Sequence, residues 1–163
     1  MSQDPATHTP LHKVPVSALV LIHTVDLQVL LIERADHAGY WQSVTGSLEY
    51  LPDGTLELPM QAAIREVAEE TGLNALDYQL SDWQMQHVYE IYPQWRHRYA
   101  PGVTENTEHV FGLELPAPVT VQLAPREHTA QEWVDWREAA QKVFSWTNVE
   151  AIRALGERHG LQL

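Results

Sequence analysis

The residues of this 163-residue chain most capable of chemistry are three closely spaced glutamates, Glu66, Glu69 and Glu70. They lie in the segment REVAEETGL, residues 65–73, which has the pattern of a helix end. At about 100° per residue the three carboxylates fall on one helix face. The opposite face, expected to meet the core, carries Ile64, Val67 and Ala68. Glu66 and Glu70 form a like-charged pair near the helix C-terminus, and a divalent cation would relieve that repulsion. Because carboxylate and water oxygens suit Mg²⁺, the spacing predicts a Mg²⁺ site, with Mn²⁺ as an alternative ion.

A solvated acidic surface is the alternative interpretation of three glutamates on a helix, and such surfaces are common. The fuller pattern Arg-Glu-apolar-x-Glu-Glu-x-Gly-apolar is much rarer. At average residue usage it should arise by chance in on the order of one in 10⁵ chains of this length. Arg65 stands beside these carboxylates in the sequence and can orient one of them by hydrogen bonding.

This segment, with Glu57 eight positions before Arg65, resembles the signature box of the Nudix hydrolases. In that family a Gly is followed after five residues by a Glu and, after seven more, by the pattern above. The leading Gly of the box would fall at position 51, which is Leu51, and the nearest suitable glycine is Gly46. We interpret the difference as a five-residue insertion, Tyr50–Gly54, in the loop before the helix.

The resemblance implies hydrolysis of a phosphoanhydride bond by in-line attack of water on phosphorus. It implies that the three glutamates of the helix act at the metal, with Glu69 either a further ligand or the base that takes the water's proton. Arg65 and Glu57 are expected to orient the cluster. In the family a carboxylate from outside the helix completes the metal site, and the sequence offers two candidates for it, Glu127 and Glu108.

Four further segments are similar to one subfamily, the dihydroneopterin triphosphate pyrophosphatases of bacterial folate synthesis. They are residues 13–16 (KVPV), 41–46 (WQSVTG), 96–108 (RHRYAPGVTENTE) and 144–148 (FSWTN). The resemblance extends over about residues 13–155 and implies cleavage of 7,8-dihydroneopterin triphosphate to the monophosphate and pyrophosphate. Two alternatives stay open. One is a Nudix pyrophosphatase of (d)NTPs or dinucleoside polyphosphates; the other is a non-catalytic Nudix-fold module that binds nucleotides.

Candidate substrate-binding residues are cations that could hold a polyphosphate and groups that the resemblance places beside the substrate. Arginine suits this role because its planar fork matches phosphate oxygens. The expected substrate-binding residues are Lys13, Arg34, Thr45, Tyr89, Glu90, Ile91, Tyr92, Arg96, Arg98 and Ser145. For each of the cations, an ordinary surface charge is the alternative interpretation.

Composition limits the partners that the chain can have. Lys and Arg number 10 against 22 Asp and Glu, a net charge of −12, and so acidic a protein is poorly suited to bind nucleic acid or anionic lipid. The absence of Cys excludes disulfides, thiolate zinc sites and iron–sulfur clusters. No apolar run is long enough to cross a bilayer, and no signal peptide is recognised. We therefore expect a cytoplasmic enzyme that acts on a small-molecule triphosphate.

The elements that must position these residues indicate a single α/β domain. The resemblance implies a Nudix fold, a mixed β-sheet sandwiched between helices, with the catalytic loop and helix at about 46–73. Residues 1–12 are expected to form a flexible lead-in, and residues 13–163 the domain. The main helix should begin near Pro59 and end at Gly72. Strands are expected at about 14–23, 27–33, 41–46, 82–92, 108–115, 119–123 and 132–136. Further helices are expected at 137–144 and 149–159, the last with a capping box of Thr147 and Glu150.

Overall fold

A computed structural model of the chain describes residues 12–163, so the expected lead-in lies outside the described residues except for His12. Within this range the strands form one mixed sheet of seven. They are β1 (Val16–Thr24), β2 (Gln28–Arg34), β3 (Trp41–Gln42), β4 (Val44–Ser47), β5 (Gln79–Glu90), β6 (Glu105–Leu115) and β7 (His128–Asp135). β1 and β6 run parallel at the centre, and β5 pairs antiparallel with β6.

β1 changes its partner along its length. Its first half pairs with β4, from Ser17↔Ser47 to Val20↔Val44, whereas its end meets β2 at His23↔Val29. β2 pairs over most of its length with β7 instead, and at its end with β3. β4 and β2 therefore pair with successive parts of β1 and diverge from each other.

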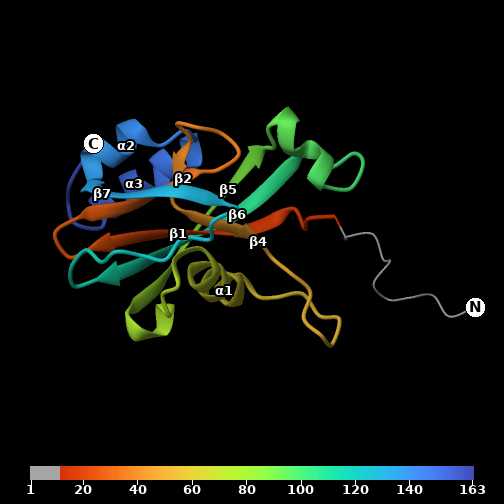
Figure 1. Cartoon of the computed structure of the whole chain (residues 1–163), viewed down its shortest axis with the longest axis horizontal. Coiled ribbons are helices and arrows are strands. Elements are labelled where there is room, and N and C mark those ends of the chain that lie inside the picture. The colour runs from red at the N-terminus through yellow and green to blue at the C-terminus, as the bar shows by residue number, and fades with distance from the viewer. Residues whose placement is uncertain (1–11) are drawn as a thin grey trace, which may run out of the picture.

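Helices cover both faces of the sheet, as expected for a Nudix fold (Figure 1). α1 (Pro59–Thr71) lies on one face, and α2 (Trp136–Lys142) and α3 (Trp146–Glu157) lie on the other. β1 is buried on both sides because its residues alternate: Ala18 and Val20 pack in the core beneath α1, whereas Leu19 and Leu21 pack in the core beneath α2 and α3. Two short 3₁₀ helices, η2 (Ala75–Asp77) and η3 (Pro93–Arg98), flank β5.

α1 begins and ends where the sequence predicted. Pro59 occupies its first position, and Gly72 ends it in the left-handed conformation, with φ of 73°. The predicted faces of the helix are only partly correct: Val67 and Ile64 do meet the core. Ala68 is exposed, whereas the buried residues are Ala62, Ala63, Glu66, Val67, Glu70 and Thr71. The two small alanines let the helix lie close to the sheet, and this turns two of the three carboxylates inward.

The C-terminal part of the chain differs from the prediction at three points. Residues 119–123 form no strand, because side chains of β7 take their backbone groups: Gln131 bonds to the N–H and C=O of Val121, at 2.8 and 2.7 Å, and the Trp133 indole donates to Val119 O. β7 begins at His128, four residues earlier than predicted. α3 begins at Trp146, and its cap is Ser145, whose Oγ accepts from Asn148 N. Among residues 12–163, no helix is long and apolar enough to cross a bilayer.

Candidate active site

A cavity of about 580 Å³ opens where β4 diverges from β2. Its walls come from the ends of many elements: the start of β1, the end of β2, β4, α1, the end of β5, β6, the start of β7 and the connection between α2 and α3. It gathers most of the expected site residues, namely Lys13, Arg34, Thr45, Glu66, Glu70, Tyr89, Glu90, Ile91, Tyr92, Arg98, Glu108, Glu127 and Ser145. Glu57, Arg65, Glu69 and Arg96 lie outside its lining.

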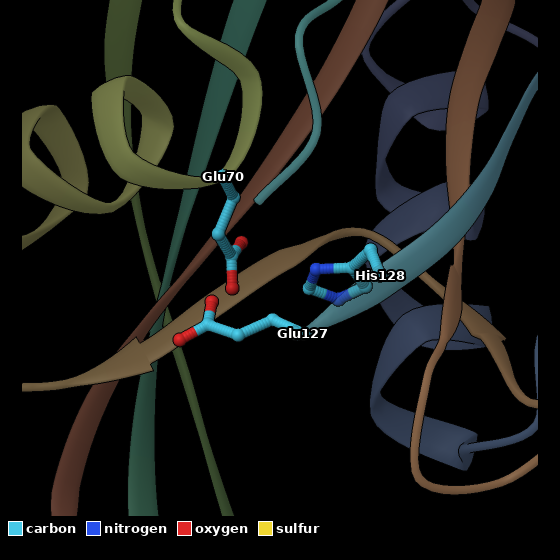
Figure 2. Close-up of side chains that lie close together, drawn as sticks. All are labelled: Glu70, Glu127 and His128. Atoms are coloured by element: carbon cyan, nitrogen blue, oxygen red, sulfur yellow. The ribbon is translucent and has the colours of Figure 1, made fainter. Parts of the chain in front are cut away.

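A carboxylate–histidine cluster lies in this cavity (Figure 2). Glu70 of α1, Glu127 and His128 each offer a ligand atom, and these atoms all lie within 4.8 Å of one another. In the part of the chain that the structure describes, Glu70 Oε2 and His128 Nδ1 are buried without a hydrogen-bond partner. Buried polar atoms left without a partner are costly, and carboxylate oxygens are the ligands that hard divalent cations prefer. The cluster therefore fits a divalent cation, and the carboxylate beside Glu70 is Glu127 rather than Glu108.

Glu66 also lines this cavity, and its side chain packs against Gly46. A Cβ at position 46 would lie 2.0 Å from Glu66 Cδ, so only glycine leaves room for this carboxylate. Burial raises the pKa of Glu66 to about 7, against the opposing hydrogen bond from Arg65. Burial, followed by the charges of Glu66 and Glu127, raises the pKa of Glu70 well above its usual value. The three carboxylates thus repel one another in the absence of a cation, which is the electrostatic pattern that a metal site requires.

Arg65 holds this arrangement from behind. Its guanidinium donates twice to Glu57, at 2.9 Å each, and also to Glu66 Oε1 at 2.7 Å and Ser47 O at 2.9 Å. The hydrogen bonds from Arg65 lower the pKa of Glu57. Arg65 also donates to Glu69 at 3.1 Å, on the exposed side of α1. Arg65 and Glu57 are therefore placed to orient Glu66, whereas Glu69 is not gathered with Glu70 and Glu127.

The inserted loop leaves this framework intact, because its two ends are tied together. Glu57 N donates to Glu49 O at 2.9 Å, and Glu49 N donates to Glu57 Oε1 at 2.7 Å. Beyond this closed base, Leu51 N donates to Thr55 O at 2.7 Å. Residues 50–56 therefore form a compact projection, and Gly46 rather than Leu51 is the residue beside Glu66.

Cations line the cavity near the carboxylates. Arg34 forms a two-point ion pair with Asp36, at 2.8 Å for each bond, and donates to Gln42 at 3.3 Å. Arg98 lies 3.5 Å from Asp36, and Arg98 O accepts from Lys13 N at 2.8 Å. Desolvation, followed by the charge of Arg98, lowers the pKa of the Lys13 ammonium group. This concentration of positive charge in an acidic protein suits a bound polyphosphate.

Arg96 does not join these cations. Its guanidinium donates to Ile91 O at 2.9 Å and to Glu90 at 2.6 Å, so it braces the turn after β5. Ser145 also has a local partner: its Oγ accepts from Asn148 Nδ2 at 2.6 Å at the start of α3.

Sequence reasoning named Tyr92 but missed the aromatic cluster around it, of which Tyr92, Trp95 and Phe144 line the cavity. Tyr92 stacks on Trp95 at 5.3 Å between centroids, Tyr40 stacks on Phe144 at 4.3 Å, and the guanidinium of Arg34 lies 4.3 Å from the Trp95 centroid. Tyr40 and Phe144 are distant in sequence from Tyr92 and Trp95, so no local pattern could group the four rings. Asp36, Gln42 and His128 were missed for the same reason.

Comparisons with known proteins match residues 13–155 to the NUDIX domain. The chain is 45% identical over 144 residues to the dihydroneopterin triphosphate diphosphatase of Escherichia coli strain K12, an alignment that covers 86% of this chain and 91% of that protein. It is 36% identical over 140 residues to the Haemophilus influenzae protein of the same name, covering 84% of each. The solved structure of the E. coli dihydroneopterin triphosphate pyrophosphohydrolase superposes with a TM-score of 0.80 at 43% identity, covering 88% of this chain and 96% of that one.

Proposed function

The chain belongs to the Nudix hydrolase family, and we propose that it hydrolyses 7,8-dihydroneopterin triphosphate to dihydroneopterin monophosphate and pyrophosphate. The observation that carries this proposal is the 45% identity to the E. coli diphosphatase across 86% of the chain. All four segments that suggested this subfamily contribute to the cavity lining: two residues of 13–16, three of 41–46 and all five of 144–148 line it. The segment 96–108 contributes Arg98, Tyr99 and Glu108.

Nudix hydrolases depend on a divalent metal, and we propose Mg²⁺ here, with Mn²⁺ as a substitute. Glu66, Glu70 and Glu127 would hold it. Glu70 has a buried oxygen without a partner among the described residues, Glu127 offers an oxygen within 4.8 Å of it, and the charges of Glu66 and Glu127 raise the pKa of Glu70. When bound, such an ion neutralises phosphate charge and lowers the pKa of coordinated water.

The protein's own groups position the substrate. Lys13 and Arg98 neutralise phosphate oxygens, while Arg34 holds Asp36 and Gln42 in place beside them. Arg65 and Glu57 fix the direction of Glu66. We propose that Glu69, once released from Arg65, serves as a further ligand or accepts a proton from the attacking water. Positioning and electrostatics of this kind supply most of the catalysis in phosphoryl transfer.

Two other functions agree less well with the site. A non-catalytic module would have no use for buried carboxylates that repel one another in the absence of a cation. A pyrophosphatase of ordinary nucleotides would share the carboxylate cluster and differ only in how the cavity recognises the heterocycle.

Product analysis tests the proposal. The protein is incubated with 7,8-dihydroneopterin triphosphate and Mg²⁺, and the products are followed by ³¹P NMR. We expect pyrophosphate and the monophosphate in equal amounts, complete loss of turnover with EDTA, and an unchanged circular dichroism spectrum in EDTA. Release of orthophosphate, or full turnover in EDTA, would contradict the proposal.

A further inference from the structure

Glu108, at the cavity end formed by β5 and β6, lies outside the carboxylate–histidine cluster of Glu70, Glu127 and His128. It is 3% exposed and lines the cavity, yet within residues 12–163 its Oε1 has no hydrogen-bond partner. His87 Nδ1 is 3.8 Å away, beyond hydrogen-bonding distance. A buried carboxylate oxygen without a hydrogen-bond donor is unfavourable, so Glu108 Oε1 suits a ligand that donates a hydrogen bond to it.

The neighbours of Glu108 are also polar and incompletely bonded. In the sheet it stands between Ser17 of β1 and His87 of β5. Asn106, two residues earlier on the same face, donates to Ser17 Oγ at 2.7 Å. Among the described side chains, Asn106 Oδ1 and His87 Nδ1 are likewise buried without partners. Of the three residues with such atoms only Glu108 lines the cavity, so its oxygen is the one that a ligand in the cavity can reach.

This end of the cavity lies on the other side of the sheet from α1. Val110, two residues beyond Glu108, packs in the core beneath α2 and α3, so Glu108 belongs to that face. Glu66 and Glu70 come from α1, on the opposite face. Because both sets line one cavity, a ligand with its phosphates at the carboxylate cluster can extend its far end to Glu108.

Aromatic rings bound the space around Glu108. Tyr89 of β5 and Trp146 of α3 line the cavity, and Trp146 is 52% exposed, with its ring edge-on to His87 at 5.3 Å. A flat heterocycle fits such a space, since stacking and apolar contact suit its faces. The Glu108 carboxylate would then face the edge of the heterocycle.

We propose that Glu108 recognises the heterocycle of the substrate by accepting two adjacent N–H donors, a ring N–H and the exocyclic amino group beside it. A 2-amino-4-oxo ring, as in a pterin or guanine, presents such a pair of donors, whereas adenine presents an acceptor beside its amino group. Glu108 is thus a specificity residue at the far end of the cavity. The inference rests on the proposed function for the identity of the substrate, but its chemistry applies to any 2-amino-4-oxo heterocycle.

Paired nucleotides test this role without relying on any variant. GTP and ITP differ only in the 2-amino group, so wild-type kcat/KM for GTP should exceed that for ITP by about 10- to 100-fold, the value of a hydrogen bond to a charged group. Equal values for GTP and ITP in the wild-type protein would overturn the proposal.

A substitution then connects this preference to Glu108. In Glu108→Gln the GTP/ITP ratio should fall toward one, kcat/KM for dihydroneopterin triphosphate should fall by a similar factor, and ATP hydrolysis should hold or rise. Glu105→Gln, an exposed carboxylate on the same strand, is the matched control and should keep the wild-type ratio. An unchanged ratio in Glu108→Gln, or an equal loss on GTP, ITP and ATP, would overturn the proposal.

These results are separable from the proposed function. If dihydroneopterin triphosphate is not cleaved but the GTP/ITP preference depends on Glu108, the substrate assignment fails and the recognition role stands. If the pterin substrate is cleaved and the preference is absent, the recognition role fails alone.

Discussion

Adding one methyl group at Gly46 should disable the metal site without unfolding the protein. In Gly46→Ala the new Cβ would lie 2.0 Å from Glu66 Cδ and 2.1 Å from its Oε1, whereas ordinary contacts begin at 3.4 Å. The carboxyl group must therefore retreat by about 1.4 Å. A displacement of about 1 Å in a positioned group can cost on the order of 10²-fold in rate, so we expect kcat to fall about 100-fold.

The cost to folding should be small, because the displaced atoms are the end of a flexible side chain. The melting temperature of Gly46→Ala should stay within about 3 °C of the wild type. Kinetics with Mg²⁺, calorimetric titration with Mn²⁺ and thermal melting measure the three quantities. We expect weaker Mn²⁺ binding together with the loss of kcat.

Gly112→Ala is the matched control. Its Cβ would lie 2.3 Å from the ring of Trp83, outside the lining of the catalytic cavity. This variant should lose thermal stability and keep its kcat. Wild-type kcat and Mn²⁺ affinity in Gly46→Ala would refute the role of Gly46 in placing Glu66. A loss of kcat in Gly112→Ala as large as that in Gly46→Ala would also refute it.

Three other predictions concern the same framework. Glu70→Gln should lower kcat by about 10²- to 10³-fold. The melting temperature of the metal-free variant should hold or rise, because repulsion from Glu66 and Glu127 is relieved. Near-wild-type turnover would contradict this prediction. The metal-free protein should lose stability between about pH 5 and pH 8, because raised carboxyl pKa values favour the folded state only while the groups stay protonated. That loss should lower its melting temperature by roughly 5–10 °C, and Mg²⁺ should restore more at pH 8 than at pH 5; a pH-independent melting temperature would refute it. Deletion of residues 50–54 should leave a folded protein with measurable hydrolysis, since Glu49 and Glu57 already close the loop; loss of Mn²⁺ binding would show that the loop builds the site.

The sequence predicted the helices and strands whose ends and burial depend on neighbouring residues in the chain. α1 follows from a proline in its first turn and a glycine at its end, and the central strands follow from long apolar runs. The helical wheel of α1 placed Val67 and Ile64 against the core correctly, but it was wrong for Ala68, which is exposed, and for Glu66 and Glu70, which are buried. In the fold, close approach of Ala62 and Ala63 to the sheet decides the buried face, and it carries Glu66 and Glu70 inward. Burial of carboxylates contradicts apolar patterning, and such contradictions are expected at functional sites.

Contacts between distant segments could not be predicted from local patterns. Residues 119–123 have the alternation of a strand, but Gln131 and Trp133 take their backbone groups. Glu127 and Glu108 were equivalent in the sequence. Only the fold brings Glu127 beside Glu70 and leaves Glu108 between β1 and β5.

The choice of substrate is tested most directly by relative specificity. Values of kcat/KM with Mg²⁺ are determined for 7,8-dihydroneopterin triphosphate, for the common NTPs and dNTPs, and for a dinucleoside polyphosphate. We expect kcat/KM for the pterin substrate to exceed that for every other compound, with GTP and dGTP the best of the nucleotides. An ordinary nucleotide with an equal or higher kcat/KM would contradict it and leave a Nudix hydrolase with a different substrate.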